Sequence, residues 1–183
     1  ALRRGGPAEY EAAIRQAIED IELETENLRA IITDLRPSLL DDLGLLPAIE
    51  ALMERRRTGG LDIQSRLDLP DPLPHMGPEL ETTIYRVLQE ALTNVAKHAQ
   101  ATQARVTVTL DGEGVQLQVS DNGVGFDPGQ PTRGFGLAGM RERVYLAGGQ
   151  LEVSPGPSGT VVRVRVPLAR ADDADRSADQ MAS

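Results

Sequence analysis

The chain has 183 residues, of which 40% are hydrophobic, so it can bury one sizeable core and a smaller appended element. It contains no cysteine, which excludes disulfide and zinc-thiolate chemistry, and its formal net charge of −9 argues against a nucleic-acid-binding surface. No apolar run approaches the roughly twenty residues that span a bilayer, and the N-terminus lacks a signal-peptide core. The sequence therefore predicts one main soluble domain.

The first region predicts a long amphipathic helix over about residues 8–36, roughly 45 Å in length. Its apolar residues recur in alternating steps of four and three, with only Thr25 breaking the series, which is an a/d heptad seam. Pro37 ends or kinks the helix. The regular seam favours a bundle or coiled coil over a helix that lies on its own domain. The seam residues are Ile14, Ile18, Ile21, Leu28, Ile32, Leu35 and Leu39.

A second helix is expected to begin at Pro47 and to end at Gly59 and Gly60, after the basic run Arg55-Arg-Arg57. These arginines are more typical of a solvated helix end than of a nucleic-acid site. Residues 61–69 alternate well enough for a strand, and a proline-rich loop follows.

The next helix is expected to begin at Pro78, and its sequence pattern predicts one polar and one apolar face. Arg86, Glu90, Asn94 and Lys97 fall along one polar stripe, and an apolar stripe lies apart from it. An Asn carbonyl is a hard oxygen ligand that suits an Mg²⁺ held mostly by phosphates and water. Glu90, one turn earlier, can orient or deprotonate a nearby group. The apolar stripe consists of Ile84, Leu88, Ala91 and Val95.

Strands are expected over 104–110 and 115–119, joined by a turn at 111–114. The run Asp121-Asn-Gly123-Val-Gly125 follows the second strand. A carboxylate at a strand end can accept a hydrogen bond from an exocyclic amine, and glycines let the backbone approach a flat base closely. This run is therefore interpreted as the adenine-binding part of a nucleotide site.

The run Gly134-Phe135-Gly136-Leu137 opens a predicted helix over 137–147, whose free N–H groups would form an anion site for phosphates. Residues 150–154 and 160–168 predict a hairpin. From residue 169 onward the sequence offers little to bury and predicts a disordered acidic tail.

The order Glu90-x-x-x-Asn94, Asp121-x-Gly-x-Gly125 and Gly134-x-Gly-Leu137 resembles the N, G1 and G2 boxes of the GHKL ATPases, which include DNA gyrase and the sensor histidine kinases. Within them, Gln89-Glu-Ala-Leu-Thr-Asn-Val-Ala-Lys-His-Ala99 is similar to the nitrate-sensor and DesK-like branch of two-component kinases. Each box alone is a weak signal, but three in order at compatible spacing is a strong one.

The resemblance implies a Bergerat-type, two-layer α/β sandwich, with a mixed sheet of about five strands and three helices, preceded by the long helix. We expect residues 1–40 to be the second dimerisation helix, and 41–60 a linker with the first helix leading into the ATPase domain. Residues 61–168 would be the catalytic ATP-binding domain and 169–183 the tail. Residues 126–133 would form a short ATP lid. The chain begins without Met, as a fragment of a longer protein would.

The resemblance also implies Mg-ATP as the bound nucleotide, with ADP as product, a cytoplasmic location and a homodimer formed through dimerisation helices. Whether the full-length protein is anchored in a membrane stays open. Lys97 would face phosphate oxygens, Thr160 would support Asp121, and His98 stands where many relatives have a second Asn. The other expected nucleotide-binding residues are Asn94, Gly123, Gly125, Gly134, Phe135, Gly136 and Leu137, with Asn94 as metal ligand and with Glu90 and Asn94 as catalytic residues.

The leading hypothesis is a histidine kinase whose phosphoacceptor histidine lies outside this sequence and passes the phosphoryl group to a response regulator. Neither His75, in a proline-rich loop, nor His98, inside the N box, stands in a His-Asp or His-Glu setting. Two alternatives remain open. One is an anti-sigma-factor type of serine kinase, which normally lacks the long heptad helix. The other is an interaction module that binds nucleotide without transferring phosphate.

Overall fold

The computed structural model describes Tyr10 and residues 38–70, 72–74, 76–125, 136–156 and 159–168. Apart from Tyr10 and the seam residue Leu39, the predicted heptad helix lies outside the described residues, as do the predicted lid, His75 and the acidic tail. The described elements are α2 (Ser38–Leu43), α3 (Leu45–Thr58), β1 (Asp62–Asp68), α4 (Pro78–Asn94), the π-helix η1 (Val95–Ala99), β2 (Gln103–Asp111), β3 (Gly114–Asp121), α5 (Gly136–Leu146), β4 (Gln150–Gly156) and β5 (Gly159–Pro167).

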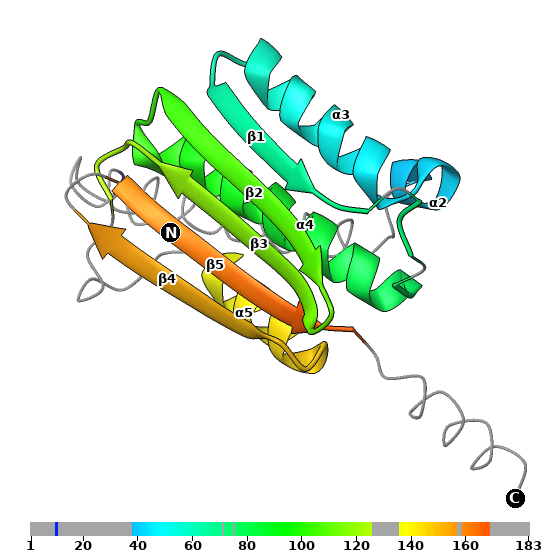
Figure 1. Ribbon diagram of the computed structural model, residues 1–183. Coiled ribbons are helices and arrows are strands. Elements are labelled where there is room, and N and C mark those ends of the chain that lie inside the picture. Colours follow the sequence, from blue (N-terminus) through cyan, green and yellow to red (C-terminus); the bar gives the residue numbers. More distant parts are fainter. Residues whose placement is uncertain are drawn as a thin grey trace, which may run out of the picture.

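The strands form one mixed sheet in the order β1-β2-β3-β5-β4 (Figure 1). β1 pairs with β2 in parallel, and the remaining neighbours are antiparallel. Helices cover one face of this sheet: α3 contacts β1, α4 contacts β3, and α5 contacts β4 and β5. The predicted two-layer α/β sandwich with five strands is therefore confirmed.

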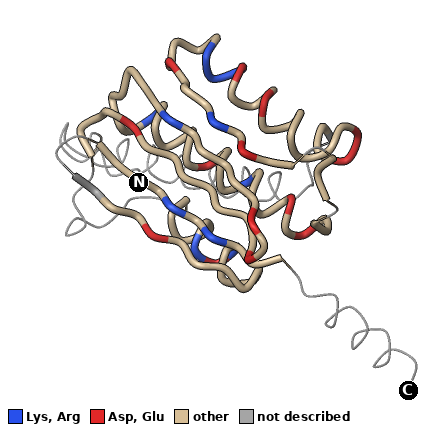
Figure 2. Tube along the Cα trace, viewed as in Figure 1, with Lys and Arg blue, Asp and Glu red and all other residues tan. Residues whose placement is uncertain are grey.

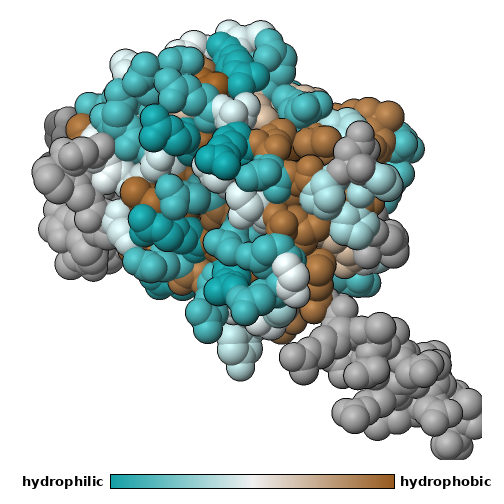
Figure 3. Space-filling model, in the orientation of Figure 1, coloured by the Kyte–Doolittle hydropathy of each residue, from teal (hydrophilic) through white to brown (hydrophobic). Residues whose placement is uncertain are grey.

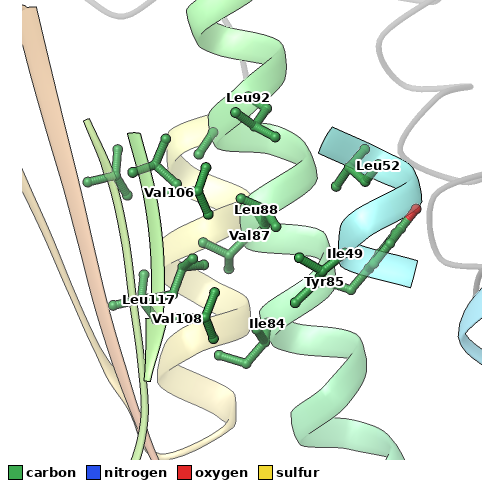
Figure 4. Close-up of a cluster of buried hydrophobic side chains, with 14 of the residues drawn as sticks. Ile49, Leu52, Ile84, Tyr85, Val87, Leu88, Leu92, Val106, Val108 and Leu117 are labelled. Carbon is green, nitrogen blue, oxygen red and sulfur yellow. The ribbon is translucent and has the colours of Figure 1, made fainter. Parts of the chain in front are cut away.

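The core lies between the sheet and α4, and a second apolar layer joins α4 to α3 (Figure 4). Val106, Val108 and Leu117 point from β2 and β3 toward Val87 and Leu88 of α4. The alternation of strand side chains puts every second residue on this face. Burying each of these side chains contributes about 1.5–3 kcal/mol. α4 is thus fixed on two sides, which makes it a rigid support for the residues near its end.

The start of α3 differs slightly from the sequence prediction, whereas the start of α4 agrees with it. α3 begins at Leu45, so Pro47 lies inside its first turn, where the missing N–H costs no hydrogen bond. α4 begins at Pro78, as expected, and carries Glu79 and Glu81 in its first turn, where acidic groups favour the positive helix end. Among the helices that the structure describes, none is both long and apolar enough to cross a membrane.

The outer face of the sheet is largely hydrophilic, with hydrophobic residues gathered on the side nearer α2 (Figure 3). Basic residues on β5 lie beside an acidic residue on β4 (Figure 2). Arg163 Nη1 lies 3.8 Å from Glu152 Oε1, and Arg165 pairs with Glu113 near the β2–β3 turn. These cations are paired with carboxylates, as expected for a solvated sheet face.

Candidate nucleotide site

The last α-helical turn of α4 carries the two residues assigned to the metal and to catalysis. Glu90 and Asn94 are both half-buried at the end of the helix. The Asn94 side chain makes no capping hydrogen bond to the segment that follows, so its amide oxygen remains available to a ligand. Arg86, predicted on the same polar stripe, is instead only 7% exposed, and its Nη1 donates to Gln89 Oε1 at 2.7 Å. Arg86, which the helical wheel puts on the polar stripe, is therefore more deeply buried than Glu90 and Asn94.

The helix does not continue regularly through the N box. Beyond Asn94 the backbone becomes the π-helix η1, which ends at Gln100 in the left-handed conformation with φ 52°. Lys97 and His98 lie on η1 and are exposed. A π-helical turn is rare and frequently occurs at functional sites. It changes the direction in which these two side chains leave the helix, and no pattern in the sequence predicted it.

Asp121 is the last residue of β3 and is half-buried. Strand alternation places it on the same face as Leu117 and Val119, toward the helices. Its Oδ1 accepts a hydrogen bond from the backbone N–H of Gly123 at 2.8 Å. This turn uses one carboxylate oxygen to orient the side chain and leaves the other for a ligand.

Gly123 allows the loop after Asp121 to approach the end of η1. A Cβ at Gly123 would stand 2.8 Å from the Ala99 carbonyl carbon and would clash with its oxygen. The neighbouring Val124 N–H donates to that Ala99 oxygen at 2.9 Å. Gly125 has φ 70°, a conformation that glycine adopts without strain. The G1 and N boxes are therefore in direct backbone contact.

Asn122, which the sequence analysis did not single out, holds the same loop from the other side. Its Oδ1 accepts hydrogen bonds from the backbone N–H groups of Thr102 and Gln103 at 3.0 and 2.9 Å, and its Nδ2 donates to Thr102 Oγ1 at 3.0 Å. The amide oxygen and the amide nitrogen of Asn122 thus both have hydrogen-bond partners inside the protein. Its place between Asp121 and Gly123, with an amide suited to bonding backbone groups, is the signal that could have found it.

Gly136, the first residue of α5, lies against the carboxyl group of Glu90. A Cβ at Gly136 would stand 3.0 Å from Glu90 Cδ and would clash with Oε1. The start of α5 and the last turn of α4 are therefore adjacent, which brings the G2 box to the N box. Leu137 is half-buried and packs against the core. Gly134 and Phe135 lie outside the described residues.

The start of β5 completes the site beside Asp121. Ser120 pairs with Val161, so continuing that antiparallel register by one residue places Thr160 opposite Asp121. Strand alternation puts Thr160 on the face of the buried Val162. Gly159 is a further residue that the sequence analysis missed. It has φ 117°, and a Cβ there would stand 2.7 Å from the Asp121 carbonyl carbon. A glycine directly before Thr160 at the end of a turn was the available signal.

The donor set fits a metal that arrives with a nucleotide. Among the described residues, no group of three or more His, Asp or Glu side chains could hold a metal ion. Mg²⁺ commonly takes one or two protein ligands and fills its other positions with waters and phosphate oxygens. A single Asn94 oxygen beside Glu90 suits that mode of binding and does not suit a metal held by the protein alone.

A family model described as histidine kinase-, DNA gyrase B-, and HSP90-like ATPase matches residues 79–170. This range contains Glu90, Asn94, Asp121, Gly136 and Thr160. It begins one residue inside α4 and extends just beyond β5.

Among curated proteins, the sensor histidine kinase MctS of Rhizobium johnstonii is 35% identical over 91% of this chain and 37% of its own length. The signal transduction histidine-protein kinase/phosphatase UhpB of Salmonella typhimurium is 37% identical over 83% of this chain and 30% of its own length. The chain thus spans about a third of these relatives. Among solved structures, the histidine kinase domain of a blue-light activated histidine kinase from Erythrobacter litoralis is 26% identical with a TM-score of 0.54, over 66% of this chain and 58% of that one.

Proposed function

Because the chain belongs to the histidine kinase-, DNA gyrase B- and HSP90-like ATPase family, we propose that it is the catalytic, Mg-ATP-binding part of a sensor histidine kinase. The observation that carries this proposal is the placement of Gly136 against Glu90, which joins two motifs more than forty residues apart in the sequence. With Asp121 and Thr160 at the neighbouring strand ends, the site has separate places for a base, a metal and phosphates. Two relatives that match most of this chain are named a sensor histidine kinase and a signal transduction histidine-protein kinase/phosphatase.

Asp121 is the proposed adenine-recognition residue. Its second carboxylate oxygen would accept a hydrogen bond from the exocyclic amine of the base. Thr160, opposite Asp121 in the extended register, would support the carboxylate, and its hydroxyl can both donate and accept. The close backbone approach at Gly123 and the positive φ of Gly125 fix the path of the loop that follows Asp121.

Asn94 and Lys97 would bind the metal and the phosphates. A bound Mg²⁺ supplies Lewis-acid stabilisation of negative charge on the phosphate oxygens. Asn94 would hold the cation through its amide oxygen, and the exposed ammonium group of Lys97 would neutralise phosphate charge. The start of α5 would add backbone N–H groups to that cradle. Glu90 would orient or deprotonate the incoming nucleophile from its position beside Gly136.

In the intact protein, the γ-phosphoryl group would pass to a histidine nitrogen on a dimerisation helix outside this sequence. A nitrogen–phosphorus bond forms, the bond between phosphorus and the bridging oxygen breaks, and ADP leaves. A response-regulator aspartate would then take the phosphoryl group. We place this reaction in the cytoplasm and in a homodimer, as proposals that follow from the likeness to sensor histidine kinases. His98 is on the site segment η1, and we assign it no part in the transfer.

Asn94→Ala is expected to weaken ADP binding in the presence of Mg²⁺ by about tenfold or more, because it removes a metal ligand. Affinity measured in a chelator should change little, because the residue is assigned to the cation and not to the base. Calorimetry with ADP under both conditions makes the comparison. Gln64→Ala, which removes an exposed amide from the edge strand β1, is the control and should leave both affinities unchanged. An equal loss with and without Mg²⁺ would remove Asn94 from the metal site.

A further inference from the structure

The three consecutive arginines at the end of α3 have three different environments. Arg55 is exposed. Arg57 donates from Nε and Nη2 to the Ile63 carbonyl oxygen at 3.1 and 2.8 Å, which ties the end of α3 to β1. Arg56 is half-buried and points to α4 instead. The basic run lies at the end of α3, as expected, but Arg56 is less exposed than its two neighbours.

Arg56 reaches the last turn of the N-box helix. Its Nη2 donates to Thr93 Oγ1 at 2.6 Å, and the same hydroxyl donates to the Gln89 carbonyl oxygen at 2.7 Å. The hydroxyl thus joins the guanidinium of α3 to the backbone of α4. The bridged residues, Gln89 and Thr93, immediately precede Glu90 and Asn94. The contact therefore acts on the turn that carries both proposed catalytic residues.

Packing and hydrogen bonding alone do not favour an arginine at this position. Arg56 Nε is buried without a hydrogen-bond partner. Among the residues that the structure describes, no carboxylate pairs with the Arg56 guanidinium. A partly buried cation whose bonded partner is a neutral hydroxyl is less favourable than an apolar side chain of similar size. Beyond the general preference for a basic residue in the last turn of a helix, the position gains from arginine the contact with Thr93.

We infer that Arg56 is a positioning residue for the metal-bound nucleotide and acts through Thr93. α4 ends at Asn94 and the π-helix η1 begins at the next residue. The turn from Gln89 to Asn94 is therefore not followed by another α-helical turn that would hold it in place. The bond from Arg56 holds this turn from outside the helix and so fixes where the Asn94 oxygen lies relative to the phosphates. This assignment rests on the proposed function, because it concerns binding of Mg-nucleotide.

The test compares Arg56→Met with Arg55→Met, which makes the same change one residue earlier, at an exposed position. Mg²⁺ raises the affinity for ADP by some factor, and we expect this factor to be about three- to tenfold smaller in Arg56→Met than in Arg55→Met. The ADP affinity measured with a chelator and the thermal midpoint should be equal in the two variants. A midpoint above that of the control also fits, because the variant removes a poorly paired cation. Arg56→Lys, which keeps a donor, should recover part of the lost affinity.

Thr93→Val removes the hydroxyl and keeps the shape of the side chain. It should cause the same loss of Mg²⁺-dependent affinity for ADP. The double variant should bind no more weakly than the weaker-binding single variant, because both changes break the same hydrogen bond. If wild-type chain gains affinity from Mg²⁺ and Arg56→Met gains the same amount, Arg56 is not a positioning residue. If wild-type chain gains none, the proposed function itself fails, and the assignment of Arg56 fails with it.

Discussion

Asp121→Asn is expected to weaken ADP binding by roughly ten- to a hundredfold without unfolding the protein. A hydrogen bond to a charged group contributes about 1.5–3 kcal/mol, and each 1.4 kcal/mol is a factor of ten in affinity. The Asn oxygen can still accept the Gly123 N–H bond now made by Asp121 Oδ1, so the turn should persist. The second oxygen, however, is replaced by an NH₂ group, which cannot accept a hydrogen bond from the adenine amine.

The matched control for this change is Asp111→Asn. Asp111 also accepts a hydrogen bond from the backbone N–H two residues later, that of Glu113, at 2.9 Å. It is the last residue of β2 and lies at the opposite end of the sheet from Asp121. Calorimetry and a thermal melt on both variants separate recognition from stability. An Asp121→Asn protein that binds ADP as tightly as the wild type would show that Asp121 does not recognise adenine.

Gly123→Ala should both destabilise the protein and abolish tight nucleotide binding. The added Cβ would meet backbone atoms of Ala99, which are held by η1 and cannot rotate away as a flexible side chain would. The loop must then move outward, which breaks the bond from Val124 N–H to the Ala99 oxygen. Overpacking of this kind typically costs about 1–3 kcal/mol. The displaced loop would move Asp121 and Gly125 away from their positions relative to Asn94.

Gly112→Ala is the corresponding control. A Cβ at Gly112 would have no other atom within 4 Å, and Gly112 does not have a positive φ. Thermal melts and ADP titrations should show Gly112→Ala close to the wild type. A Gly123→Ala protein with unchanged midpoint and unchanged affinity would contradict the close contact between the G1 loop and η1.

Strand and helix positions followed from local patterns in the sequence. Alternation in β2, β3 and β5 gave their buried faces, because these strands have one face on the helices and one toward solvent. Pro78 predicted the start of α4 correctly, because the fixed φ of proline matches the first turn of a helix. Three glycine- or amide-containing motifs predicted residues that the structure brings together, such as Glu90 and Gly136. Their roles toward a nucleotide stay predictions.

The missed features depend on contacts between segments that are distant in the sequence. Arg56 resembles its two neighbours in every local respect, and only the packing of α3 on α4 distinguishes it. Gly159 is needed because β5 brings it against Asp121, nearly forty residues earlier. The π-helical turn at Val95 arises where α4 meets the G1 loop, and helix propensity cannot indicate it. The heptad seam from Ile14 to Leu39 stays a prediction.

The most direct test of the account is a calorimetric comparison of ADP and GDP binding to the wild-type chain in Mg²⁺. Adenine presents an amine donor where guanine presents a carbonyl acceptor, so a carboxylate at Asp121 should attract the first and repel the second. We expect ADP to bind at least about tenfold more tightly than GDP, because a site built to hydrogen-bond an amine donor rejects a carbonyl acceptor at the same place. Equal affinities, or no binding of ADP, would contradict an adenine-nucleotide site in this protein.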